Sequence, residues 1–332
     1  MSSLSSPAQA PLRSPGSARP SFKTEPTKQD SPKLSRSNPR KAVALMVMAV
    51  GLFAIMDAVV KWMGQSYSTT QIVFFRSLFA FLPLSFFIFR AGIGAALRVN
   101  DAKTHVLRSA VGLVAMFTFF YAYANMPLAD AIAISFAAPI FVTALSVPLL
   151  GEKVGPRRWA AVLAGFVGVL IMVQPGPGLL QSVAIVPLIG VVFYALAAIY
   201  VRKLSHTDSP TSIVFYFTLA CTVVSGVLLP FSWVTPSLAD LMCLIAVGLI
   251  GGLAQITITQ AFRHADVALV MPFEYTGMIW AAVLGFMFWG ETPGLNIWIG
   301  VAIVVAAGLY ILFREANLGL PRGAARKLQP RR

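Results

Sequence analysis

Long apolar runs alternate with short polar connections along most of the chain. Most runs have about 20 residues, the length that an α-helix needs to cross the hydrocarbon core of a membrane. They are continuously apolar and do not alternate, which indicates helices and not the strands of a membrane barrel. Ten runs follow one another, at 42–63, 70–89, 107–125, 129–150, 158–174, 183–202, 211–231, 240–262, 267–289 and 295–313. The pattern predicts an all-α integral membrane protein with ten transmembrane helices.

One apolar block occurs twice. Ala129–Glu152 (ADAIAISFAAPIFVTALSVPLLGE) and Ala268–Glu291 (ALVMPFEYTGMIWAAVLGFMFWGE) both end in Gly-Glu, and a shift of 139 residues superposes them without a gap. Near the start of each half, residues 66–75 resemble residues 206–216 at a shift of 141. The 139 shift also aligns Gly112/Gly251, Ala115/Ala254, Thr118/Thr257, Gly155/Gly294, Trp159/Trp298, Val162/Val301 and Leu170/Leu309. This shared register indicates an internal duplication.

The positions of Lys and Arg predict the orientation of the chain. If the N-terminus is cytoplasmic, every Lys and Arg except Lys61 and Arg76 falls in a cytoplasmic tail or connection, as positive-inside topology requires. Both termini are then cytoplasmic. The halves, 42–174 and 183–314, each hold five helices, so the second half lies inverted relative to the first. Inverted repeats are typical of secondary transporters, whose substrate site lies near the midplane between the halves.

Composition supports the membrane reading and excludes several other classes. The chain of 332 residues is 57% hydrophobic and 11% charged, whereas soluble domains have about 25% charged residues. The net charge of +14 arises in tails and short connections, which does not favour nucleic acid as a partner. Cys221, Cys243 and the three His show no metal-ligand spacing. No phosphate-binding loop or catalytic cluster is present, so we expect neither a cofactor nor enzymatic activity.

The two ends of the chain are polar. Residues 1–39 are rich in Ser and Pro and have no apolar periodicity, which predicts a disordered cytoplasmic tail. Residues 315–332 are predicted to form a basic cytoplasmic tail.

The chain resembles the drug/metabolite transporter superfamily, EamA type, over about residues 42–314. The resemblance rests on the ten helices, the five-plus-five repeat and the Gly-Glu that closes the fourth and ninth helices. Several stretches resemble the branch that contains riboflavin and S-adenosylmethionine uptake carriers: MDAVVKW (56–62), IVFFR (72–76), HVLRS (105–109), the run from Pro127 to Pro139, and AFRHADVALVMPFEY (261–275). The resemblance implies a central cavity lined mainly by helices 1, 3, 4, 6, 8 and 9. Many relatives carry Glu-Pro in the ninth helix, where this chain has Pro272 and Glu274.

By resemblance, we expect a carrier of a small organic metabolite in the bacterial inner membrane, with riboflavin uptake as the first candidate and S-adenosylmethionine uptake as the second. Export of amino acids or toxic metabolites is the alternative, because the superfamily contains both directions. A membrane-embedded enzyme or scaffold that handles lipid is the alternative of another class. The expected partners are the substrate and the lipid bilayer, and small residues in the fifth and tenth helices would also allow a homodimer.

Ionisable residues inside predicted spans are the first candidates for the site, because a charge in lipid is costly and turns toward a partner or a cavity. Asp57 and Arg76 lie at matching depth in the first and second helices, and Lys61 is one turn from Asp57. We expect these three residues to form a cluster, and one interpretation of it is a site that binds a charged part of the substrate or a proton. The alternative is a structural ion pair between the first two helices, with Lys61 extending to the membrane surface.

The ninth helix holds a further carboxylate, Glu274, just after Pro272. A carboxylate beside a locally broken helix suits a substrate site, and pairing with Arg263 or His264 is the alternative. Glu152 and Glu291 are expected to fix helix ends. The remaining candidates could hydrogen-bond or stack on a ligand, or could bond between helices; they are Tyr121, Asn125, Gln255, Gln260 and Tyr275.

Overall fold

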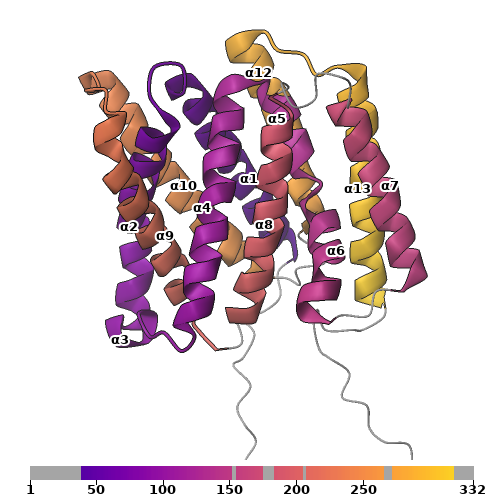
Figure 1. Ribbon diagram of the computed structural model, residues 1–332, viewed down its shortest axis with the longest axis horizontal. Helices are drawn as coiled ribbons and strands as arrows, with labels where there is room; N and C mark the ends of the chain where they lie inside the picture. The colour runs from indigo at the N-terminus through magenta and orange to yellow at the C-terminus, as the bar shows by residue number, and fades with distance from the viewer. Residues whose placement is uncertain (1–38, 152–154, 175–182, 205–206, 265–270, 318–332) are drawn as a thin grey trace, which may run out of the picture. The chain divides into compact units, whose positions relative to one another are not determined.

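The regular secondary structure of the described residues is entirely helical (Figure 1). In this computed structural model, the described residues are 39–151, 155–174, 183–204, 207–264 and 271–317. The elements are α1 (Pro39–Met63), α2 (Thr69–Ala91), α3 (Ile93–Ala96), α4 (Ala102–Asn125), α5 (Leu128–Ser135), α6 (Ala138–Leu150), α7 (Pro156–Val173), α8 (Ile185–Leu204), α9 (Pro210–Leu228), the 3-10 helix η2 (Leu229–Phe231), α10 (Leu238–His264), the 3-10 helix η3 (Met271–Thr276), α12 (Gly277–Trp289) and α13 (Leu295–Asn317). The predicted tails, 1–39 and 315–332, lie outside the described residues except for Pro39, which begins α1, and residues 315–317, which end α13.

Seven stretches of the described helices are long and apolar enough to cross a membrane. They lie in α1, α2, α4, α5 with α6, α8, α9 and α10. Two shorter apolar stretches follow in α7 and α13, and the ninth predicted run forms η3 and the 13-residue α12. The prediction of a multi-span helical membrane protein is confirmed, and the count of ten spans stays a prediction.

The duplicated block is not one continuous helix in either copy. The first copy is interrupted between α5 and α6, and the second changes from η3 to α12. Pro139 lies in the first turn of α6, where its missing N–H removes no helical hydrogen bond. Both α6 and α12 have 13 residues and begin 139 residues apart. Each ends at a glycine in the left-handed conformation, Gly151 with φ 65° and Gly290 with φ 67°, which favours glycine.

Helix ends also recur at the 141 shift near the start of each half. The end of α1 corresponds to the end of α8, and the beginning of α2 corresponds to the beginning of α9. Ser68 caps α2 by accepting a hydrogen bond from Gln71 N at 3.2 Å. Ser209 caps α9 by accepting one from Ser212 N at 3.1 Å. The same local signal, a serine before the first helical turn, therefore sets equivalent boundaries in both halves.

Helix packing pairs equivalent elements across the two halves. Helices α1 and α2 pack on α10, whereas α8 and α9 pack on α4. Helix α2 packs on its counterpart α9, and α7 packs on its counterpart α13. Because each of the last two pairs joins a helix to its own repeat equivalent, this is the packing that a two-fold relation between the halves requires.

Close approach of α7 and α13 depends on Gly168. A Cβ atom on Gly168 would lie 2.9 Å from Gly300 O and 3.0 Å from Val304 Cγ2. We therefore expect Gly168→Val to lower the free energy of unfolding by about 1–3 kcal/mol, as overpacking does. Thermal unfolding of the purified protein in detergent measures this. Gly155→Val is the control, because a Cβ there meets nothing within 4 Å; equal melting of the two variants would contradict the packing assigned to α7 and α13.

Candidate functional site

Lys61 and Glu291 form an ion pair at the end of the bundle where α1 ends. Lys61 Nζ lies 2.6 Å from Glu291 Oε1 and donates to Met126 O at 2.6 Å. Glu291 Oε2 accepts from Leu128 N at 3.0 Å. The two side chains are 6% and 19% exposed. This Lys61 cluster (Lys61, Met126, Leu128, Glu291) joins α1 to the α4–α5 connection, to the start of α5 and to the second residue after α12.

The predicted grouping of Lys61 with Asp57 and Arg76 is therefore wrong. One turn along α1 was expected to bring Lys61 to Asp57, but the lysine finds a carboxylate 230 residues away in sequence. The expectation that Glu291 fixes a helix end agrees with its hydrogen bond to the first residue of α5. Its repeat equivalent Glu152 lies outside the described residues.

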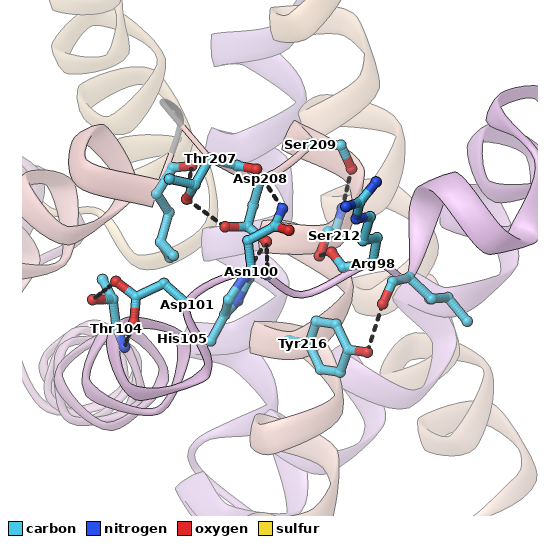
Figure 2. Close-up of polar contacts among 12 residues, drawn as sticks. Arg98, Asn100, Asp101, Thr104, His105, Thr207, Asp208, Ser209, Ser212 and Tyr216 are labelled. Atoms are coloured by element: carbon cyan, nitrogen blue, oxygen red, sulfur yellow. Dashed lines mark hydrogen bonds and ion pairs between the residues drawn. The ribbon is translucent and has the colours of Figure 1, made fainter.

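A second group of contacts joins the connection before α4 to the connection between α8 and α9 (Figure 2). Asn100 donates from its backbone N to Asp208 Oδ1 at 2.8 Å and from Nδ2 to Thr207 O at 2.6 Å. His105 Nε2 lies 3.5 Å from Asp208 Oδ1. Two hydroxyls of α9 donate to the connection before α4: that of Ser212 to Arg98 O at 3.0 Å and that of Tyr216 to Leu97 O at 2.9 Å. We call these residues the Asn100 cluster.

Asp208 is the central acceptor of the Asn100 cluster. Burial on its own raises the pKa of this carboxyl, but hydrogen bonds from Thr207 and Asn100 and the neighbouring His105 outweigh burial and hold the pKa below its ordinary value. A lowered pKa in the folded state means that the stabilisation is present at neutral pH and is lost as the pH falls through that lowered pKa.

We expect Asp208→Ala to lower the free energy of unfolding at neutral pH by about 1–3 kcal/mol, because Asn100, Thr207 and the buried His105 lose their acceptor. The difference from the wild type should shrink as the pH falls below the ordinary range of aspartate. Thermal unfolding in detergent at a series of pH values measures both effects. A difference that does not change with pH would show that the charge of Asp208 contributes nothing.

The opposite end carries an equivalent group of contacts, the Gln71 cluster. Gln71 Nε2 donates to Val234 O at 2.8 Å, and Gln71 Oε1 accepts from Val234 N at 3.1 Å. Tyr67 donates to Asp240 Oδ2 at 2.8 Å. At the 141 shift, Gln71 corresponds to Ser212 of the Asn100 cluster, and both residues are fully buried. Each half therefore holds the other at one end of the bundle with residues from equivalent positions.

Six polar side chains of the spans between these ends form a closed series of electrostatic pairs, here called the interior ring, in which Asp57 is buried and Tyr194 is exposed. Each of these side chains interacts electrostatically with the next, and they come from α1, α2, α9, α4 and α8. In order around the interior ring they are Asp57, Arg76, Cys221, Arg108, Tyr194 and Tyr123. The ring brings together one carboxylate, two guanidinium groups and two phenols, which can bind a polar organic molecule and discriminate its charge.

Asp57 and Arg76 are brought within electrostatic range of each other, although α1 and α2 are not packed closely together. Both helices pack on α10 instead. Gly251 of α10 makes room between them, since a Cβ there would lie 2.7 Å from Met56 Sδ and 3.7 Å from Arg76 Nε. The role of Asp57 and Arg76 in binding stays a prediction.

Sequence reasoning missed Arg108 by placing it in a cytoplasmic connection. Asp101 caps α4 and accepts from Thr104 N at 3.0 Å, so the helix begins at Ala102 and holds Arg108 in its second turn. The guanidinium carbon lies 3.7 Å from the centre of the Phe217 ring. Recognising Asp101 as an N-cap would have started the helix five residues before the apolar run and placed Arg108 inside the span.

The other predicted candidates lie on α4, α10 and η3. Glu274, in η3, is an electrostatic neighbour of Tyr194, and Tyr275 packs edge-on against Phe136 with centroids 5.2 Å apart. Asn125 donates to Tyr121 O at 2.8 Å within α4, and the Tyr121 side chain is exposed. Gln255 and Gln260 lie on α10, the first exposed and the second half-buried. Within the described residues, no group of three or more His, Cys, Asp or Glu could hold a metal ion.

Comparison with known proteins assigns the family. The model of the EamA-like transporter family matches residues 40–174 and again residues 181–314. The chain belongs to the EamA-like transporter family. A solved structure entitled "Crystal structure of protein" matches with a TM-score of 0.60 and 17% identity, covering 86% of this chain and 100% of that one. At that identity the likeness concerns the fold alone.

Several characterised EamA relatives cover most of the chain. The pseudopaline exporter CntI of Pseudomonas aeruginosa (strain UCBPP-PA14) is 34% identical, covering 80% of this chain and 94% of the exporter. A riboflavin transporter of Rhizobium johnstonii is 29% identical, covering 81% and 90%. An S-adenosylmethionine uptake transporter of Rickettsia prowazekii is 26% identical, covering 79% and 89%. The resemblance to the branch with riboflavin and S-adenosylmethionine carriers is confirmed, and an exporter stands beside it.

Proposed function

We propose that this EamA protein is a secondary transporter that moves a small organic metabolite across the bacterial inner membrane. It does so through ten spans arranged as two inverted five-helix halves, with both termini cytoplasmic. The recurring helix ends, the packing of α2 on α9 and of α7 on α13, and the matched Gln71 and Asn100 clusters support the inverted arrangement.

The interior ring is the observation that carries the proposal. Charged side chains inside spans are costly and mark substrate or ion pathways in membrane proteins. Here the charged side chains Asp57, Arg76 and Arg108 lie on first-half helices, and the polar side chain of Tyr194 lies on α8 of the second half. A molecule held among them would contact both halves, which is what alternating access by relative rocking of the halves requires.

The Lys61 cluster supports a gate in the same cycle. Helix α1 packs on α4 and on α12, and the ion pair of Lys61 with Glu291 ties these elements together. The repeat equivalents of the α1–α12 and α1–α4 contacts are α8–α6 and α8–α10. Helix α8 packs on α6, but α8 and α10 are not closely packed within the described residues. With the N-terminus cytoplasmic, the closed end faces the periplasm, and we assign this conformation to a state closed on the periplasmic side.

Substrate and direction are tested together in cells. The relatives suggest riboflavin and S-adenosylmethionine for uptake and pseudopaline for export. Labelled riboflavin and labelled S-adenosylmethionine are supplied to an auxotroph that expresses the full chain, and retention of preloaded label is followed in parallel. Uptake or accelerated loss of one label supports transport of that molecule. No effect with either label rejects both as substrates.

A further inference from the structure

Arg108 is a cation in the interior that has only part of its hydrogen-bonding capacity used. It lies six residues into α4, and its Nε and Nη1 atoms are buried without an acceptor. One face of the guanidinium is covered by Phe217 at 3.7 Å. Gly112 makes room for this arrangement, because a Cβ there would lie 2.7 Å from Arg108 Nη1 and 2.8 Å from Phe217 Cε2. The residues nearest to Arg108 therefore position it and leave donors unused.

Arg108 also differs from Arg76 in its charged surroundings. Arg76 has the carboxylate of Asp57 as an electrostatic neighbour. Arg108 interacts electrostatically with Cys221, Tyr194 and Arg76, and Tyr194 in turn interacts with the carboxylate of Glu274. A guanidinium within a span is costly, and a bound anion would supply acceptors for its buried Nε and Nη1 atoms together with a compensating charge.

The two arginines approach from opposite ends of the bundle. Arg76 lies seven residues from the beginning of α2, next to the Gln71 cluster, and Arg108 lies six residues from the beginning of α4, next to the Asn100 cluster. They are electrostatic neighbours despite these opposite starting points. Both side chains therefore reach toward the middle of the membrane, where an alternating-access transporter holds its substrate.

We propose that Arg108, with Arg76 as a second cation, binds an anionic group of the transported molecule, a carboxylate or a phosphate. Phe217 covers one face of Arg108, Tyr194 interacts electrostatically with it, and Phe119 lies edge-on to Tyr194 at 6.5 Å; these aromatic side chains suit a flat organic part. The inference rests on the proposed transport function. Of the two uptake candidates, only S-adenosylmethionine carries a carboxylate, which it holds beside an ammonium and a sulfonium group.

Matched pairs of probes test the inference on the purified full-length protein in detergent. Riboflavin is compared with riboflavin 5′-phosphate, S-adenosylmethionine with its decarboxylated form, and inorganic phosphate is measured alone. Binding is followed by equilibrium dialysis and by thermal unfolding. We expect the anionic member of at least one pair to bind tenfold or more tightly than its partner. Arg108→Gln should weaken that binding on the order of 100-fold, as loss of a buried charge partner does, and Arg108→Lys should weaken it less.

Two further variants control the measurement. Arg90 also lies against a phenylalanine, Phe86 at 5.7 Å, but it is exposed at the end of α2, so Arg90→Gln should bind like the wild type. Phe217→Leu keeps Arg108 and removes only its ring contact, and it reports on the site if Arg108→Gln does not fold.

The outcomes separate the anion site from the transport function. Equal binding within both pairs, unchanged binding by Arg108→Gln, or absence of binding by every anionic probe overturns the anion site. Transport in cells that does not depend on Arg108 also overturns it while the transport function stands. Anion binding that depends on Arg108, with no transport of any tested molecule, supports the anion site and counts against the transport function.

Discussion

Lys61→Met will lower the rate of transport tenfold or more. The lysine holds Glu291 at 2.6 Å and Met126 O at 2.6 Å, so its loss leaves a largely buried carboxylate without its cation. Breaking a fully buried ion pair costs about 3–5 kcal/mol, and the partial exposure of Glu291 reduces this to about 2–3 kcal/mol. Because the ion pair joins α1 to the segments after α4 and α12, its loss destabilises the closed state by that free energy. Initial rates of uptake or efflux in cells measure the effect.

Two controls make this prediction specific. Lys103 is exposed on the first turn of α4, so Lys103→Met should transport at the wild-type rate. The exchanged pair, Lys61→Glu with Glu291→Lys, should recover part of the activity that either single change removes. Wild-type rates in Lys61→Met would show that the ion pair is not part of the transport cycle, and no recovery in the exchanged pair would show that the two residues do not act together.

Asp57→Asn will reduce transport at least 100-fold while the protein still reaches the membrane. Asp57 is 8% exposed, belongs to the interior ring and is the carboxylate that interacts electrostatically with Arg76. Replacement by the amide keeps the shape, removes the negative charge and leaves Arg76 uncompensated. Transport should be lost because both the charge balance of the ring and its preference for substrate charge change. Uptake rates, normalised to the amount of protein in membranes, measure the loss.

A double variant distinguishes the two roles that Asp57 could have. If Asp57 only balances Arg76 structurally, Asp57→Asn should cost nothing more once Arg76 is Gln, so the double variant should fold and transport like Arg76→Gln alone. If Asp57 acts on the substrate, the double variant should melt like Arg76→Gln and transport at least tenfold more slowly than that variant. Asp57→Glu keeps the charge and should retain partial activity. Equal transport by Arg76→Gln and the double variant would contradict a binding role of Asp57.

The apolar pattern predicts helices well because each span must be apolar over its whole length. The repeat register also anticipates helix ends, as the equivalent caps at Ser68 and Ser209 show. The interruption before α6 was not anticipated, because the residues on both sides of it are apolar and give no break in the pattern. Lipid-facing and core-facing positions are equally apolar in a membrane, so periodicity cannot assign the inner face of a span.

Partners of charged residues are the part that sequence could not supply. Local spacing placed Lys61 with Asp57, but side chains at the end of a helix reach the connections of other helices, and those neighbours follow from packing alone. Arg108 was not recognised as a residue of the span for a different reason. A positively charged residue near a helix start looks the same to a charge count whether it lies in the connection or one turn inside the span.

Counterflow in proteoliposomes tests the central claim most directly. Vesicles that contain the purified protein are loaded with unlabelled S-adenosylmethionine, riboflavin or pseudopaline, the molecules named by relatives, and are diluted into the same molecule in labelled form. The account predicts transient accumulation of label for at least one molecule, without ATP or an imposed ion gradient, and its loss in the Asp57→Asn protein. Label no higher than in protein-free vesicles for all three molecules would contradict it.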